Sequence, residues 1–173
     1  QGMQPPGLPH LIQFNKRDLP KLSPIEDMNA ALNKYNAPFY ESVAVTGIGV
    51  QDTLKAIVKL VLLHLNTDWG KTTADLFEGK AKDLGAQIVY RDAYLPDEKD
   101  FKTIITKARD ASPVGLALMS YYTDAALIAQ QARAQGLTVP IIANGATYSP
   151  KFIELGGEAV EGAATTSTWF SGN

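Results

Sequence analysis

Short apolar runs that alternate with amphipathic stretches constrain the fold of this chain more than any other feature. Buried strands are expected at residues 10–14, 39–45, 87–90, 114–121, 139–143 and 163–169, and amphipathic or turn-bounded stretches between them predict helices. Strands that alternate with helices of about 10–15 residues build βαβ units and a mainly parallel sheet. The pattern therefore predicts an α/β fold, a three-layer Rossmann-like or flavodoxin-like sheet with helices on both faces.

Residues 59–65 are compatible with two structures. Apolar residues recur on one helical face, at Leu54, Ile57, Val58, Val61, Leu62 and Leu65. The segment Lys59–Leu65 is also a continuous apolar run, as in a buried strand, and a loop and a further helix follow it. We expect the helix on the basis of periodicity and keep the strand as the alternative.

Local signals mark the ends of several expected helices. Ser23 and Glu26 flank Pro24 in a capping-box pattern, which predicts a helix with the proline at its first position that runs to about Tyr35. Gly85 follows an expected helix at residues 72–84, as is common at helix C-termini.

The composition excludes several kinds of function. Sixteen Lys and Arg residues against 18 Asp and Glu residues leave a net charge of −2, so no nucleic acid partner is expected. The chain has no cysteine and only two histidines, His10 and His64, which argues against thiolate chemistry, a metal site and a bound cofactor. No apolar run approaches the roughly 18 residues of a membrane span, so no membrane association is expected.

A polar motif follows the first expected strand. Residues 15–18 read Asn-Lys-Arg-Asp, an N-K-x-D pattern. The carboxylate of Asp18 could accept hydrogen bonds from both the ring N–H and the exocyclic amine of guanine, and Lys16 could lay its methylene stem over the base. Asn15 would tie this loop to a neighbouring one. On its own, the motif is more typical of a polar strand-to-helix turn than of a guanine site.

Residues 11–63 resemble the C-terminal part of the gliding-motility class of bacterial Ras-like GTPases. The resemblance is carried by residues 15–20, 41–45 and 52–55. It implies that the backbone N–H of Ala44 meets the guanine carbonyl, and hence a vestigial guanine site of Asn15, Lys16, Asp18 and Ala44.

The phosphate-binding parts of such a GTPase are not found in this sequence. Phosphate and Mg²⁺ contacts supply most of the nucleotide affinity and the hydrolytic chemistry. Residues 70–73, Gly-Lys-Thr-Thr, match only the end of a P-loop motif, because Leu65 stands at the first glycine position and Asp68 would repel a phosphate. We therefore expect no enzymatic activity and at most weak guanine-nucleotide binding.

From about residue 65 the sequence resembles the second lobe of the type I periplasmic binding proteins, in the branched-chain amino-acid group. The similarity is carried by residues 66–71, 94–101, 120–126, 131–137 and 148–155. In that family the ligand lies between two lobes, at the carboxyl ends of the strands. The resemblance implies a vestigial small-ligand site with Trp69 as an aromatic wall, Tyr122 as a hydroxyl donor and Asn144 at a position that is acidic in some relatives. Half a cleft would bind an amino-acid-like ligand only weakly.

Because the sequence resembles an incomplete part of each of two protein families, we interpret it as an engineered chimera without natural catalytic activity. We expect residues 1–3 to be a tag remnant, residues 4–64 to derive from the GTPase and residues 65–173 from the binding protein, merged into one globular domain. The parents resemble a cytoplasmic and a periplasmic protein, so a recombinant soluble protein is expected. Uncovered apolar sheet surface predicts a homodimer or a domain swap. Weak binding of guanine nucleotide or of an amino-acid-like ligand stays open.

Overall fold

The computed structural model describes the backbone of residues 11–166, and all of their side chains except those at positions 51 and 54–56. The expected tag remnant and residues 167–169 of the last expected strand lie outside the described residues. The chain divides into two compact units, Gln1–Val58 and Lys59–Asn173. The change of ancestry at residue 65 and the merging of both segments into one domain stay predictions.

The first unit contains two parallel strands and two helices. Strand β1 (Ile12–Phe14) pairs with β2 (Phe39–Glu41), and α1 (Ile25–Leu32) connects them. Helix α2 (Val50–Ile57) follows. Both strands are shorter than expected, and α1 ends before Tyr35.

The expected capping box at the start of α1 does not form. Pro24, rather than Ser23, is the N-cap residue, and no side chain caps the helix. Pro24 has an extended ψ of 144°, so the helix begins at Ile25. The Ser23 hydroxyl is therefore one residue too far from the free N–H groups of the first turn.

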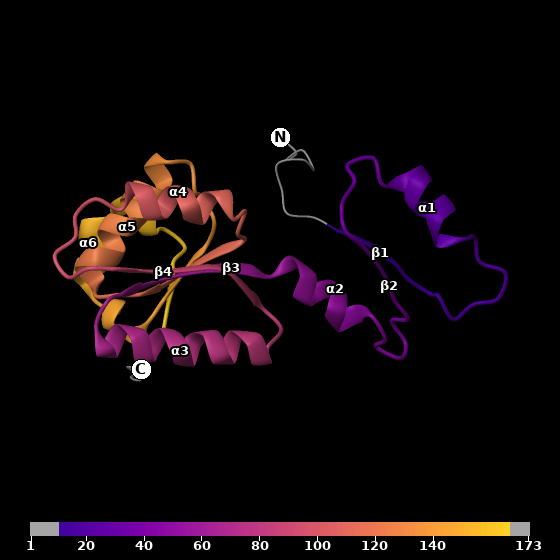
Figure 1. Ribbon diagram of the computed structural model, residues 1–173, viewed down its shortest axis with the longest axis horizontal. Coiled ribbons are helices and arrows are strands. Elements are labelled where there is room, and N and C mark those ends of the chain that lie inside the picture. Colours follow the sequence, from indigo (N-terminus) through magenta and orange to yellow (C-terminus); the bar gives the residue numbers. More distant parts are fainter. Residues whose placement is uncertain (1–10, 167–173) are drawn as a thin grey trace. The chain divides into compact units, whose positions relative to one another are not determined.

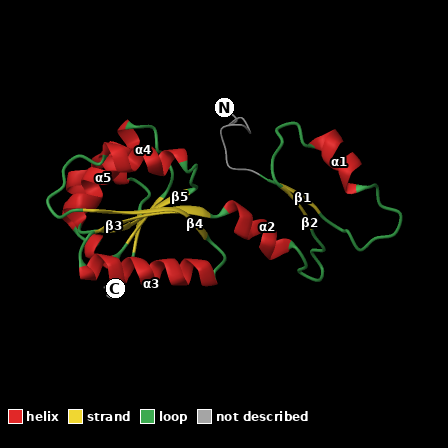
Figure 2. Ribbon diagram, in the orientation of Figure 1, coloured by secondary structure: helices red, strands yellow, loops and turns green. Residues whose placement is uncertain are grey.

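The second unit is a parallel sheet between two layers of helices (Figure 2). Its strands, in spatial order, are β4 (Gln87–Tyr94), β3 (Lys59–Leu65), β5 (Gly115–Met119), β6 (Ile141–Ala143) and β7 (Ala164–Thr165). Helix α3 (Asp68–Asp83) lies on one face, and α4 (Lys102–Asp110), α5 (Tyr122–Ala134) and α6 (Pro150–Gly156) lie on the other (Figure 1). The 3₁₀ turns η2 (Gly145–Thr147) and η3 (Gly157–Val160) flank α6. This arrangement confirms the expected three-layer α/β fold.

Strand β3 shows that the expected helix at residues 59–65 is wrong. The strand lies between β4 and β5, with Leu63 opposite Asp92 on one side and Leu118 on the other. Because helices cover both faces of this central strand, apolar residues occupy consecutive positions without a period of two. Of the residues with helical spacing, only Leu54 and Ile57 lie in α2, which ends at Ile57, whereas Val61, Leu62 and Leu65 lie in β3.

Successive residues of β3 enter two separate cores. Val61, Leu63 and Leu65 belong to the larger core, beneath α4, α5 and α6. Leu62 belongs to a smaller core beneath α3, together with Ala74, Ala117 and Met119. The sheet is thereby held from both sides, and its carboxyl edge presents the loops that follow β3, β4, β5 and β6.

Candidate functional site

In the first unit, the side chain of Asn15 joins the two loops of the expected guanine site. Its Oδ1 atom accepts hydrogen bonds from the backbone N–H of Lys16 (2.7 Å), the backbone N–H of Ala44 (2.9 Å) and the Ser42 hydroxyl (3.4 Å). This is the tie between loops that the motif predicts for asparagine. It also occupies the Ala44 N–H, which the resemblance assigns to the guanine carbonyl.

The remaining residues of the N-K-x-D motif shape the loop and leave its polar groups exposed. Lys16 has a φ of +58°, in the left-handed region, and both Lys16 and Asp18 are exposed. Arg17 anchors the turn, because its Nε donates to Glu41 at 2.6 Å and its backbone N–H donates to the Ser42 carbonyl at 3.2 Å. Asn15, Lys16, Asp18 and Ala44 thus lie on two adjoining loops, and guanine binding there stays a prediction.

In the second unit, two aromatic side chains stack at the carboxyl edge of the sheet. Trp69 and Tyr121 have nearly parallel rings, 7° apart in orientation and 4.9 Å between centroids. Trp69 follows β3 and Tyr121 follows β5, and these strands are neighbours. The rings remain 37% and 48% exposed. The pair forms a flat aromatic surface open to solvent, which we call the aromatic platform.

Tyr121, the neighbour of the expected site residue Tyr122, is the tyrosine that stacks on Trp69, and the role of Tyr122 as a hydroxyl donor stays a prediction. Tyr121 is the N-cap of α5 and Tyr122 its first residue, so the two adjacent side chains diverge. Tyr122 is partly buried against the larger core, whereas Tyr121 stacks on Trp69. The sequence shows two adjacent tyrosines at residues 121 and 122, but only the position at which α5 begins decides which one faces outward.

Asn144 lies at the end of β6 and is bonded to the end of β5. Its Oδ1 accepts from the backbone N–H of Ser120 at 3.3 Å, and only 8% of the residue is exposed. The Ser120 hydroxyl in turn accepts from the Tyr94 hydroxyl at 2.7 Å, and Asp124 lies 3.5 Å from the same hydroxyl. Burial raises the pKa of Tyr94, as does the charge of Asp124, so this phenol remains a donor at neutral pH.

The residues expected in the small-ligand site therefore share one edge of the sheet. A cavity of about 780 Å³ lies elsewhere, beside α6 and η3. Phe152, Val160 and Ala163 are among its walls, and Trp69, Tyr122 and Asn144 are not.

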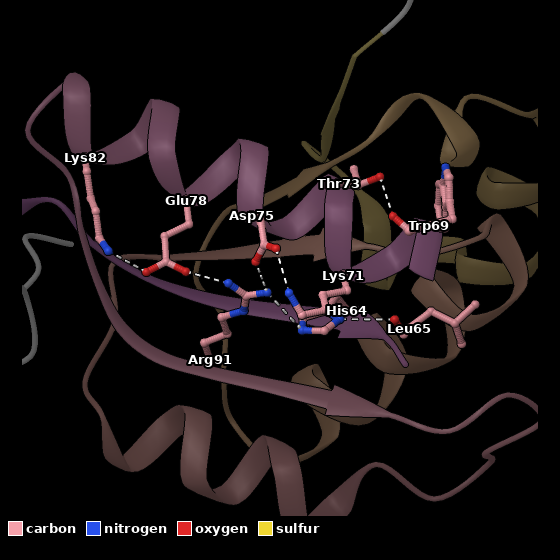
Figure 3. A network of polar contacts seen from close by, with 9 residues as sticks. All are labelled: His64, Leu65, Trp69, Lys71, Thr73, Asp75, Glu78, Lys82 and Arg91. Atoms are coloured by element: carbon pink, nitrogen blue, oxygen red, sulfur yellow. Dashed lines mark hydrogen bonds and ion pairs between the residues drawn. The ribbon is translucent and has the colours of Figure 1, made fainter. Parts of the chain in front are cut away.

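A network of charged groups joins α3 to the sheet away from this edge (Figure 3). Arg91 of β4 donates to Asp75 and to Glu78 of α3, both at 2.7 Å. Hydrogen bonds from lysine and then from Arg91 hold the pKa of both carboxylates below its ordinary value. His64 completes the network, because its Nδ1 bonds the Leu65 carbonyl at 3.1 Å and its Nε2 lies 3.4 Å from Arg91.

The start of α3 does not resemble a phosphate-binding loop. Thr67 caps the helix by accepting from the backbone N–H of Gly70 at 3.1 Å, and Lys71 binds Asp75 at 2.9 Å. The helix begins at Asp68, four residues before the expected start. Among residues 11–166, no cluster of three or more His, Cys, Asp or Glu side chains is placed to hold a metal ion. In the same part of the chain, no helix is long and apolar enough to cross a membrane.

Comparisons with known proteins give two kinds of similarity. The mutual gliding-motility protein MglA of Myxococcus xanthus is 54% identical over 65 residues, which are 38% of this chain and 33% of MglA. The Leu/Ile/Val-binding protein homolog 2 of Brucella abortus is 30% identical over 108 residues, 62% of this chain and 29% of that protein. The chain thus spans about a third of the length of each relative.

Solved structures agree with the second similarity. The leucine binding protein LivK of Thermotoga maritima superimposes with a TM-score of 0.61 at 31% identity, covering 65% of this chain and 32% of that one. The binding protein LivJ of Streptococcus pneumoniae, in complex with isoleucine, gives 0.53 at 26% identity, covering 57% and 28%. The family model described as periplasmic binding protein matches residues 14–173. The chain therefore belongs to the periplasmic binding protein family, and part of it is also similar to a gliding-motility GTPase.

Proposed function

We propose that this chain is an engineered composite without catalytic activity, and that its remaining capacity is weak binding of a small ligand at the carboxyl edge of the second unit. The observation that carries the binding proposal is the aromatic platform beside Asn144. Three strands, β3, β5 and β6, bring these residues together on a sheet with its own buried cores. Relatives named for leucine, isoleucine and valine binding make an amino-acid-like ligand the first candidate.

Weak binding is expected because the described part of the second unit leaves the platform exposed to solvent. Small-molecule sites commonly bury most of the ligand surface, whereas the platform is open and the cavity beside α6 lies apart from it. A millimolar dissociation constant, equivalent to about −4 kcal/mol, is the expected range.

An NMR titration of the ¹⁵N-labelled chain with L-leucine tests this binding. Amide signals of Trp69, Tyr121 and Asn144 should shift together and saturate, while those of exposed Leu84 should not. Replacing Trp69 by alanine should weaken the effect. No coherent shift up to about 10 mM leucine would contradict the proposal.

Guanine binding by the first unit is a second candidate, supported by the position of Asn15 between its two loops. The site offers Asp18 and the loop backbone but no phosphate contacts, so the affinity should be in the high-micromolar to millimolar range, roughly −4 to −6 kcal/mol. GDP should then bind more tightly than ADP, and Asp18→Ala should remove the difference. Equal affinities for the two nucleotides would contradict base recognition.

The absence of catalysis and the engineered origin are tested separately. Incubation with GTP and Mg²⁺ should release no phosphate above the background rate. Isolation of an uninterrupted reading frame across residues 63–66 from genomic DNA would overturn the engineered origin.

Self-association through the first unit is a further part of this proposal. Its sheet has only β1 and β2 among the described residues, and α1 buries none of its side chains. Large apolar side chains are exposed in the same unit, at Leu19, Leu32, Val45 and Ile48. We expect a dimer in multi-angle light scattering at high concentration, and a strictly monomeric mass would contradict it.

A further inference from the structure

The aromatic platform is held in place by the first turn of α3. The Thr67 cap fixes the start of the helix, and the Thr73 hydroxyl donates to the Trp69 carbonyl at 2.8 Å (Figure 3). Gly70 packs so closely on the Leu65 carbonyl that a Cβ atom would overlap it. Because the backbone on both sides of Trp69 is fixed, the ring loses little further freedom when a ligand settles on it.

The two exposed rings offer π faces to a ligand. Trp69 and Tyr121 each turn one face towards the other, which leaves an outer face on each ring. The face of an aromatic ring attracts cations, and the indole of tryptophan does so most strongly. Paired exposed aromatics at the carboxyl edge of an open α/β sheet are therefore suited to a ligand with a positive, weakly hydrated group.

Charges beside the platform favour a cation over an anion. Asp68 precedes Trp69 and is exposed, and Asp124 lies in the first turn of α5, three residues after Tyr121. Lys71, the basic residue of the first turn of α3, is bound to Asp75 at 2.9 Å. Two carboxylates thus lie within three residues of the platform along the chain, whereas the ammonium group of Lys71 is paired with Asp75.

A quaternary ammonium head suits these aromatic faces. It carries no N–H group that needs an acceptor, and aromatic faces are its usual partners in proteins.

We propose that the aromatic platform binds small organic cations with a quaternary ammonium head on an outer face of the stacked Trp69–Tyr121 pair, with Asp68 and Asp124 as the nearby negative charges. This inference rests on the proposed function, because it names the ligand class of the same edge.

Fluorescence titration of the full chain provides the test. Trp169 is first replaced by phenylalanine, which leaves Trp69 as the only indole. Choline is the probe, and 3,3-dimethylbutan-1-ol, its uncharged isostere, is the comparison ligand, both at constant chloride concentration. We expect saturable quenching by choline with a millimolar dissociation constant, and binding of the isostere that is weaker by about fivefold or more.

Variants show whether the named residues are responsible. Tyr121→Leu should weaken choline binding at least fivefold, and Asp68→Asn and Asp124→Asn should each weaken it about twofold. Tyr148→Leu, which removes another exposed tyrosine, should have no effect. Circular dichroism of every variant verifies that the fold is retained.

Each outcome separates the inference from the proposed function. Equal binding of choline and its isostere overturns the cation preference and leaves a ligand site at the edge. Shifts with leucine but no response to choline also overturn the inference alone. No response to either ligand contradicts both.

Discussion

Replacing Leu63 by alanine tests whether residues 59–65 form the central strand of the sheet. Leu63 is fully buried in the larger core and lies between β4 and β5. In the alternative helix, the apolar face would consist of Ile57, Val58, Val61 and Leu62 with their neighbours, and Leu63 would lie off that face. The two structures therefore predict different costs for the same substitution.

The expected cost follows from the burial of Leu63. The change removes three carbon atoms from a side chain with 0% exposure. At about 0.8 kcal/mol for each buried carbon, the transfer contribution is about 2.4 kcal/mol, and the cavity left behind raises the total to about 3–4 kcal/mol. For a unit of this size, such a loss lowers Tm by roughly 12–16 °C.

Thermal unfolding followed by far-UV circular dichroism and by tryptophan fluorescence measures this loss. Leu76→Ala is the matched control, because Leu76 is 71% exposed on α3 and alanine is a better helix former. The control should change the free energy of unfolding by less than about 0.5 kcal/mol. A cost below about 1 kcal/mol for Leu63→Ala would refute the buried central strand.

Four further substitutions, one of them a control, test other parts of the structure. Gly70→Ala should lower the free energy of unfolding of the second unit by more than about 2 kcal/mol, because the added Cβ would overlap the Leu65 carbonyl. Gly79→Ala should raise Tm slightly, because a Cβ at Gly79 meets open space and alanine is the better helix former. Equal effects of the two would refute the close approach at Gly70. Arg91→Met should lower the stability at pH 7, and its difference from the parent chain should shrink as the pH falls below about 4. The reason is that Asp75 and Glu78 have a lowered pKa in the folded chain, so they stabilise the fold at pH values above their unfolded pKa and lose that contribution when they are protonated. A stability difference between the variant and the parent chain that does not vary with pH would count against this. Asn15→Ala should accelerate hydrogen exchange of the Ala44 amide about fivefold or more, corresponding to about 1 kcal/mol, and unchanged protection would show that this bond is not formed in solution.

Gly85 marks the end of a helix, as its place in the sequence predicts. In the structure, Ser149 caps α6 through its hydroxyl, with Pro150 at the first helical position. Gly85 and Gly136 have positive φ values just beyond α3 and α5, a conformation that glycine adopts at little cost. The sequence around Ser23 carries a similar signal, yet no cap forms, because the extended backbone of Pro24 places the helix start one residue later.

The edge of the sheet that carries the expected site residues could be anticipated from the sequence, but their contacts could not. Trp69 and Asn144 lie at the carboxyl edge, because parallel strands end at the same edge. The stacking of Tyr121 on Trp69 depends on where α5 begins, and the role of Tyr122 as a hydroxyl donor stays a prediction. The sequence also does not show that the Asn144 side-chain oxygen accepts a hydrogen bond from the Ser120 backbone N–H, because the two residues are 24 positions apart.

The sequence by itself determined the α/β class, the alternation of strands and helices, and the two family resemblances, because these depend on local periodicity and on residues in fixed spacing. Only the tertiary structure decided that Lys59–Leu65 is a strand, that Trp69 stacks on Tyr121, and that Asn15 bridges two loops. The physical reason is shared by all three. In each case the partner lies far away in the chain: β4 and β5 for β3, Tyr121 for Trp69, and the Ala44 N–H for Asn15. A short segment of sequence does not contain the residue with which it pairs.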